Sequence, residues 1–144
     1  MTVSIKADGS VESIDINQSS GQKVLDDAAR RNGMVRAQVG DRILSSQLEP
    51  HQAARMALFE YMIGNLDWSM VAGPPGDNCC HNTRLAGSGT GAQSLYPVPY
   101  DFDFSGMVGA PYAVPPEGVP VRNVRQRHYR GYCFLNAQAP AAAA

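Results

Sequence analysis

Three short stretches between residues 61 and 106 carry side chains suited to chemistry: "YMIGNLDWS" (61–69), "HNTRL" (81–85) and "PYDFDFSG" (99–106). Phosphoryl transfer uses one carboxylate to orient or deprotonate the acceptor, and an amide oxygen with a further carboxylate to hold Mg²⁺. Mg²⁺ is a hard cation that takes oxygen ligands, which Asn and Asp side chains provide. The three stretches therefore predict a Mg²⁺ site, provided that the fold brings them together.

The stretch "YPVPYDFDFSG" (96–106) places Asp101 and Asp103 two positions apart. On a strand, such residues share one face at a separation of roughly 7 Å, so the two carboxylates would serve adjacent coordination positions. The alternative is an ordinary amphipathic strand whose aspartates face water, with Tyr100, Phe102 and Phe104 on its buried side. The residues alone leave both interpretations open.

One helix and one hairpin must position these side chains. Pro50 is suited to the first turn of a helix that ends at Gly64. Its expected buried stripe follows helical spacing and consists of Ala54, Ala57, Leu58, Tyr61 and Met62. Asn65 and Asp67 then either line the site or simply cap the helix and begin the next loop.

The hairpin is expected to pair "HNTRL" with "LYPVPYDFDF". Pro97 and Pro99 confine the second strand to a sheet edge, or delay its pairing until Tyr100. The segment "VRNVRQRHYRGYC" (121–133) is expected to form a final short helix, either with a solvated basic face or with an anion bound to its arginines.

The N-terminal part has a separate pattern. Residues 2–6 alternate apolar and polar side chains, "ADGS" supplies a tight turn, and residues 11–16 continue as a slightly irregular second strand. A helix is expected from about residue 20 to residue 31, ending before Asn32-Gly33. Because an isolated two-stranded hairpin is marginal in water, this β-β-α unit needs more sheet or a partner.

Composition narrows the functional classes. The chain has 144 residues, 44% hydrophobic and 17% charged, with a formal net charge of −1. This balance fits a folded protein of one ordinary domain or two very small ones, and gives no global attraction to nucleic acid. No apolar run approaches the roughly 20 residues that span a bilayer. We therefore expect neither a nucleic-acid partner nor a membrane span.

Three cysteines, Cys79, Cys80 and Cys133, form no paired framework, and adjacent cysteines rarely bridge each other. We therefore expect free thiols, which favour a reducing, cytoplasmic compartment. A zinc site at Cys79, Cys80 and His81 is disfavoured, because adjacent cysteines lack the usual gap between ligands.

Residues 2–31, through "VSIKADGSVESIDINQSSGQKVLDDAARR", resemble the C-terminal domain of TonB-type energy transducers. The resemblance implies a periplasmic module that passes force to outer-membrane receptors through a later edge strand. That strand would come after the stretch that matches. We accordingly expect this part to act, if at all, by pairing its strands with a protein partner.

Residues 41–133 resemble the C-terminal lobe of atypical kinase-like proteins of the HipA and CotH kind, and more closely a family of uncharacterised bacterial proteins with "GNxDWS", "HN" and "PVPYDFDFSG" in this order. The resemblance implies that Asp67 is the catalytic aspartate and Asn82 the metal-binding asparagine. His81 flanks Asn82 as a second cofactor-binding residue. Asp101 takes the position of the metal-binding aspartate of a DFG-type motif, and Asp103 is the additional metal candidate.

The kinase-like pattern also implies Mg²⁺ and ATP as cofactors. Two departures accompany it: "WSMVAGPPGDNCCH" separates Asp67 from Asn82, where kinase loops use a gap of about five residues. Nothing upstream resembles a nucleotide-binding lobe with a strand-borne lysine and a helical glutamate. We therefore expect this lobe alone to have weak activity or none.

We predict an α+β protein of two unequal parts. Residues 1–33 form an incomplete TonB-like β-β-α unit, residues 41–136 a kinase-like C-lobe fragment with a loop-rich C-terminus, and residues 137–144 a disordered Ala-rich tail. The two parts are expected to be a fusion of unrelated segments or a truncated product. The leading functional hypothesis is a partial phosphotransferase lobe; the alternatives are a non-catalytic binding module that pairs strands with a partner, and a structural subunit of a larger assembly.

Overall fold

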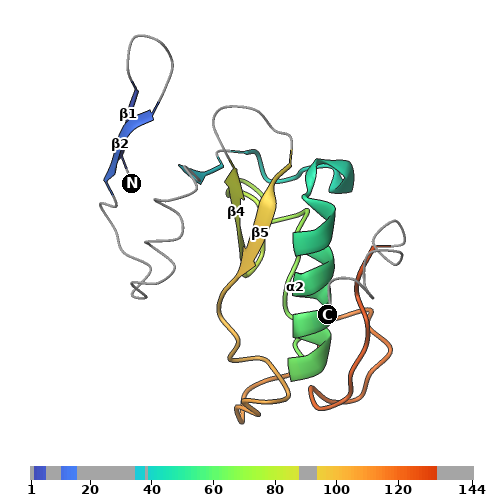
Figure 1. Ribbon diagram of the computed structural model, residues 1–144. Helices are drawn as coiled ribbons and strands as arrows, with labels where there is room; N and C mark the ends of the chain where they lie inside the picture. The colour runs from blue at the N-terminus through green and yellow to red at the C-terminus, as the bar shows by residue number, and fades with distance from the viewer. Residues whose placement is uncertain (1, 6–10, 16–34, 38, 88–93, 133–144) are drawn as a thin grey trace.

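The computed structural model describes residues 2–5, 11–15, 35–37, 39–87 and 94–132. Its regular elements are strands β1 (Thr2–Ile5), β2 (Val11–Asp15), β3 (Val35–Arg36), β4 (Thr83–Gly87) and β5 (Tyr96–Pro99), a short 3₁₀ turn η1 (Ser45–Gln47) and the helix α2 (Pro50–Ile63). One helix with antiparallel strands makes this a small α+β fold, as the sequence predicts (Figure 1). In the described part of the chain, no helix is long and apolar enough to cross a membrane.

Helix α2 begins and ends where the sequence predicts. Pro50 occupies the first turn, and the Glu49 carboxylate accepts hydrogen bonds from the backbone N–H groups of His51 and Gln52 at 3.3 and 2.6 Å. Gly64 ends the helix in the left-handed conformation, at φ 69°. Glycine suits this position because it has no Cβ to clash with the preceding turn.

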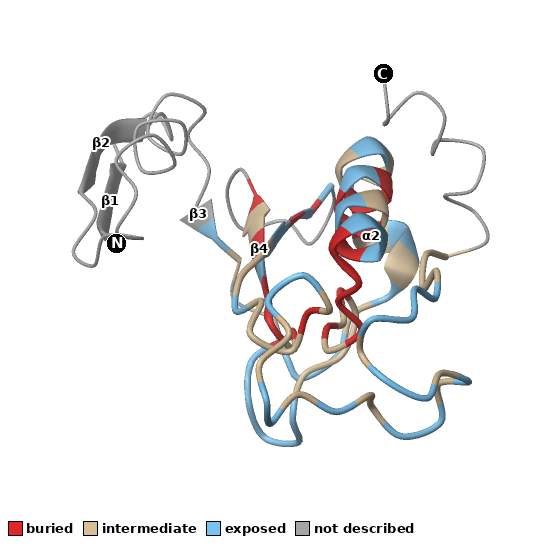
Figure 2. Cartoon of the chain, turned by 90° about the horizontal axis from the view of Figure 1, so that it is seen from below, coloured by how far each residue is buried: buried red, intermediate tan, exposed pale blue. Residues whose placement is uncertain are grey.

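The buried face of α2 differs from the predicted stripe. Tyr61 and Met62 are exposed, at 39% and 61%, whereas Glu60 is fully buried. The residues that the helix buries are Ala53, Ala54, Met56, Ala57, Glu60 and Ile63 (Figure 2). The prediction was wrong at Tyr61 and Met62, because the buried face of α2 includes Glu60 and Ile63 instead of these two residues.

Beside α2 lies a three-stranded antiparallel sheet in the order β3-β4-β5 (Figure 1). In the β4–β5 hairpin Thr83 pairs with Pro99 and Ala86 with Tyr96. The predicted hairpin is thus confirmed, with β5 at an edge and with its pairing at Pro97 and Pro99 rather than delayed to Tyr100. Gln52 on α2 donates to the Pro97 carbonyl at 3.2 Å and helps to fasten helix to sheet.

The core lies between this sheet and the helix. Small residues on α2, Ala53, Ala54 and Ala57, allow close approach, while Met56 contributes the volume. The remaining buried members of the core are Leu48, Trp68, Met70, Cys79, Cys80, Leu85 and Leu95. Four of these seven residues, Trp68, Met70, Cys79 and Cys80, belong to the loop between α2 and β4, so burial anchors the loop that carries the candidate site.

The β1–β2 hairpin is a separate two-stranded antiparallel sheet. Thr2 pairs with Asp15 and Ile5 with Val11, with a shift in register between Ser4 and Ile5. The predicted strands and their irregularity are confirmed. The predicted turn at 7–10, the helix at 20–31 and the tail at 137–144 lie outside the described residues.

The C-terminal segment 121–132 contains turns and extended chain but no helix, contrary to the prediction. Its arginines bond to carbonyls of another segment: Arg127 Nε donates to Met62 O at 3.0 Å, and Arg130 Nη1 donates to Leu66 O and Trp68 O. Tyr129 packs edge-on against Tyr61, with ring centroids 6.2 Å apart. These tertiary contacts hold the segment beside the C-terminal end of α2, and they replace the predicted helix.

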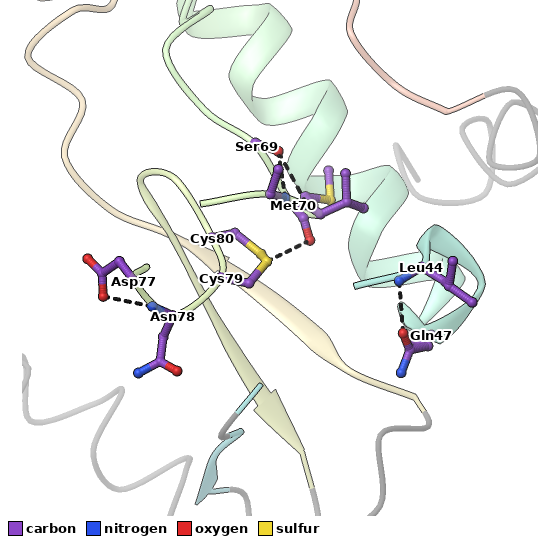
Figure 3. Close-up of a disulfide and its surroundings, with 10 residues drawn as sticks. Leu44, Gln47, Ser69, Met70, Asp77, Asn78, Cys79 and Cys80 are labelled. Atoms are coloured by element: carbon purple, nitrogen blue, oxygen red, sulfur yellow. Dashed lines mark hydrogen bonds between the residues drawn. A yellow bond between two sulfur atoms is a disulfide. The ribbon is translucent and has the colours of Figure 1, made fainter. Parts of the chain in front are cut away.

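Cys79 and Cys80 form a disulfide, and the expectation that these two cysteines are free was wrong (Figure 3). The peptide bond between them is cis, and their Cα atoms lie 3.0 Å apart. Both residues are buried, and Cys79 Sγ lies 3.9 Å from the Met70 carbonyl. The argument for a cytoplasmic location from free thiols therefore no longer applies to this pair.

Candidate functional site

The loop that follows α2 carries Asp67 and is held by Asn65. Asn65 is buried, its backbone N–H donates to Glu60 O at 2.8 Å, and its Oδ1 accepts the Asp67 N–H at 3.1 Å. The Trp68 indole N–H donates to Asn65 O at 3.0 Å. An asparagine side chain that accepts from the backbone two residues ahead makes a tight local turn, and this turn carries Asp67.

His81 and Asn82 both meet Asp67. His81 Nε2 lies 2.8 Å from Asp67 Oδ1, and Asn82 Nδ2 donates to Asp67 Oδ2 at 3.0 Å and to Asp67 O at 2.8 Å. The side chains of His81 and Asp67 remain 44% and 27% exposed, so a solute can reach this pair. The long gap between Asp67 and Asn82 is thus closed by the fold, which returns the chain to Asp67.

Asn82 connects this group to β5 as well. Its carbonyl accepts the Tyr100 N–H at 3.0 Å, directly before Asp101. Asn82 and Asp101 both have left-handed backbone, with φ 48° and 60°. Asn and Asp enter this region more readily than other residues with a side chain, so the residue types fit the conformation.

Asp101 and Asp103 do not lie on a strand, contrary to the prediction. Strand β5 ends at Pro99, and the left-handed Asp101 starts a series of turns. Phe102 packs edge-on against Phe59 of α2, with ring centroids 5.6 Å apart. The open alternatives, a wet strand face or a metal-binding strand face, both assumed a geometry that the chain does not adopt.

The turn with both aspartates docks on the end of α2. Gly106 N donates to Gly64 O and Met107 N to Ile63 O, each at 3.0 Å. These donors satisfy carbonyls that a helix end leaves without intrahelical partners. The acidic turn is therefore fastened to the residues immediately before the Asp67 loop.

Negative charge is concentrated where these segments meet. The pKa of Asp101 is raised by loss of hydration, by contact with and repulsion from Asp103, and by repulsion from Asp67. Tyr112 donates its hydroxyl to Asp103 Oδ2 at 3.0 Å, and the acceptor carboxylate raises the pKa of Tyr112. Carboxylates that repel one another disfavour their shared ionised state, which a cation among them would relieve.

The donor set fits a hard cation in chemistry: Asp67, Asn82, Asp101 and Asp103 all offer oxygen. Within the described residues, however, no three His, Cys, Asp or Glu side chains surround one metal-sized space. Asn82 directs its amide nitrogen to Asp67, so its amide oxygen is the atom available to a cation. The disfavoured zinc site fits no better, since Cys79 and Cys80 are joined to each other.

Sequence reasoning missed Tyr112 and the bracing role of Asn65. Tyr112 lies in a loop nine residues after Asp103, and no periodicity marks it. The sequence predicts Asn65 as a helix cap or a site residue, but not as the residue that holds the Asp67 turn. The signal for this role is its position two residues before Asp67, because an asparagine side chain can accept the backbone N–H two residues ahead.

The arginines of the C-terminal segment lie close by. A shallow cavity of about 250 Å³ is lined by Ile63, Gly64, Gly106, Met107, Arg125 and Arg127. Arg130 stacks over Trp68 with its guanidinium carbon 5.6 Å from the ring centroid. Comparison of the chain with protein-family models, with curated proteins and with solved structures found no match.

Proposed function

We propose that residues 41–136 form a partial kinase-like phosphotransferase lobe that binds Mg²⁺ through Asn82, Asp101 and Asp103, with Asp67 as its catalytic residue. The lobe has weak activity or none by itself. ATP is the phosphoryl donor that the kinase-like order of the motifs implies.

The observation that supports it most is the meeting of Asp67, His81 and Asn82. These residues are 14 and 15 positions apart, yet both partners bond to the Asp67 carboxylate. An aspartate that two side chains hold while it stays partly exposed has both a fixed orientation and access to a solute. A catalytic carboxylate needs such fixed orientation to meet an acceptor.

Each side chain has a distinct part in the proposed chemistry. Asp67 orients the acceptor hydroxyl through a lone pair that His81 and Asn82 leave open, since a carboxylate has about four acceptor sites. His81, bonded through Nε2, keeps its other ring nitrogen to accept a proton. When bound, Mg²⁺ would neutralise charge on the transferring phosphoryl group.

Thermal unfolding with and without Mg²⁺ or Mn²⁺ tests the metal site. Ligand that binds only the folded state stabilises it, by about 2.7 kcal/mol at one hundred times Kd, and each kcal/mol raises Tm by roughly 4 °C. We expect a rise of several degrees for the unaltered chain and none for Asp101→Ala. Glu117→Ala, an exposed acidic residue outside the site, is the matched control and should keep the rise. If neither Mg²⁺ nor Mn²⁺ changes the Tm of the unaltered chain, the proposed metal site is excluded.

A second candidate function, strand pairing with a protein partner, is favoured by the β1–β2 hairpin. In the described residues these strands pair only with each other, so each has one open edge. Open edges are templates for an added strand. A structural role in a larger assembly would use the same edges.

Capture of partners from periplasmic extract tests this alternative. Ile5→Pro removes a backbone donor within β1, next to the register shift. We expect Ile5→Pro to abolish capture, and Asp101→Ala to leave it unchanged. Equal capture by the Ile5→Pro chain would exclude strand pairing through β1.

A further inference from the structure

Glu60 is a fully buried acid for which the proposed chemistry has no use. It lies on the inner face of α2 with 0% exposure. Neither carboxyl oxygen makes a hydrogen bond, and the same holds for the buried Nδ2 of Asn65, among the described residues. An unpartnered buried carboxyl destabilises a fold, so an apolar residue would suit the core better here.

Glu60 and Asn65 are neighbours: the Asn65 N–H donates to Glu60 O at 2.8 Å, and the Glu60 carboxyl and the Asn65 Nδ2 are both buried and, within the described part of the chain, unpartnered. Burial raises the pKa of Glu60 to about 7, and the nearby Asn65 side chain opposes that rise. A carboxylate offers only acceptors and an amide nitrogen only donors, so this end of the Asn65 side chain must be Nδ2. The two groups are thus complementary, although no hydrogen bond joins them.

The other end of the same amide acts on Asp67. Asn65 Oδ1 accepts the Asp67 N–H at 3.1 Å. A flipped amide would turn Nδ2 toward that N–H, placing donor against donor. Whatever fixes the amide in its present orientation therefore also fixes the backbone that carries the Asp67 carboxylate to His81 and Asn82.

We infer that Glu60 is a positioning residue: its carboxyl fixes the orientation of the Asn65 amide, and through it the Asp67 loop. This inference deepens the proposed function. The catalytic role of the Asp67 loop rests on that function, whereas the action of Glu60 on the Asn65 amide does not. It accounts for a buried acid on a helix face that is otherwise made of alanine, methionine and isoleucine.

The test compares Glu60→Met with Glu60→Gln. Met has a similar shape without an acceptor, whereas Gln can still offer Oε1 to Asn65. We expect Glu60→Met to keep or raise Tm at pH 8, because it removes a buried unpartnered charge. Its Asp67 amide should nevertheless exchange with solvent at least tenfold faster in NMR, and Mn²⁺ affinity, measured by electron paramagnetic resonance, should fall about tenfold. Glu60→Gln should stay within threefold of the unaltered chain in both measurements.

A donor–acceptor swap keeps the test decisive if Glu60→Met does not fold. Asn65→Asp alone sets two carboxyls against each other, and should speed exchange of the Asp67 amide. Adding Glu60→Gln restores a donor opposite an acceptor, and should return the exchange rate to within threefold. Unchanged exchange in Glu60→Met, or no rescue in the double variant, overturns the inference.

The two proposals fail separately. If the unaltered chain binds no Mn²⁺, the metal site is excluded, while the Asp67 exchange rates still decide the role of Glu60. If Mn²⁺ binds and Glu60→Met changes neither affinity nor exchange, the metal site stands and the positioning role is excluded.

Discussion

Asn82 and Glu60 show how single residues shape the site by quite different means. The Asn82 amide nitrogen donates to Asp67, and the Asn82 carbonyl accepts the Tyr100 N–H. The backbone of Asn82 is left-handed, a conformation that few residues with a side chain adopt. Glu60 makes no such bond and acts by the chemistry of its buried carboxyl. Asn82 links the Asp67 loop to the residues that follow β5, and Glu60 makes the stability of the fold depend on pH.

Glu60 predicts how stability depends on pH. Its pKa is about 7 in the folded chain, against an ordinary value of 4.5, so the folded state binds the proton more tightly than the unfolded state. The associated stability is complete below pH 4.5 and is lost as the pH rises to about 7, a change on the order of 3 kcal/mol.

Denaturant titrations at pH 5 and pH 8 measure this loss. The neutral side chain of Glu60→Gln should remove most of the difference in unfolding free energy between the two pH values. A variant that loses as much stability as the unaltered chain over this range would show that another group is responsible.

At the scale of elements, the end of α2 and the acidic turn form one unit. Gly106 N and Met107 N bond to carbonyls at the helix end, and the chain at Val124 and Arg125 packs over Gly106. A Cβ added at Gly106 would meet Val124 O and would lie 2.9 Å from Arg125 Cα. Backbone atoms cannot give way as a flexible side chain does.

Gly106→Ala should therefore destabilise the fold by about 1–3 kcal/mol, the usual range for overpacking. Gly40→Ala is the matched control, since no atom lies within 4 Å of the position of its Cβ. Urea unfolding of both variants checks the prediction. Equal midpoints would mean that the chain at Val124 and Arg125 does not pack over Gly106 in this way.

At the scale of the whole molecule, the loop-rich C-terminal segment is attached by arginines rather than by regular structure. Arg130 bonds to the carbonyls of Leu66 and Trp68, which flank Asp67, and it stacks over the Trp68 ring. In Figures 1 and 2 this segment runs on the side of α2 away from the sheet. One guanidinium thus joins the segment to the candidate catalytic loop.

Arg130→Ala should lower the unfolding free energy by about 1.5–3 kcal/mol, the range for hydrogen bonds to a charged group. It should also speed limited proteolysis within residues 110–132. The control is Arg122→Ala, because the Arg122 contact to Gln126 uses its backbone N–H and survives the substitution. Identical cleavage rates in both variants would contradict the anchoring role of Arg130.

Helix α2 and the β4–β5 hairpin could be predicted from residues close together in the sequence. The bounds of α2 follow from Glu49, Pro50 and Gly64, and the β4–β5 hairpin from its apolar and proline pattern. These features depend on capping, on fixed backbone angles and on near neighbours, all of which a sequence displays. The residue types also indicated the stretches that carry Asp67, His81 and Asn82, which the fold brings together.

Tertiary contacts decided the rest. The sequence could not show that Glu60 is buried, that Asp101 leaves the strand, or that Arg127 and Arg130 would be drawn to distant carbonyls instead of forming a helix. In each case the deciding partner lies on another segment, and the free energy of burial or hydrogen bonding there exceeds the small local preference. The amino-acid sequence by itself determined which groups are available for chemistry; only the folded chain determined which of them face one another, because that depends on contacts between residues far apart along it.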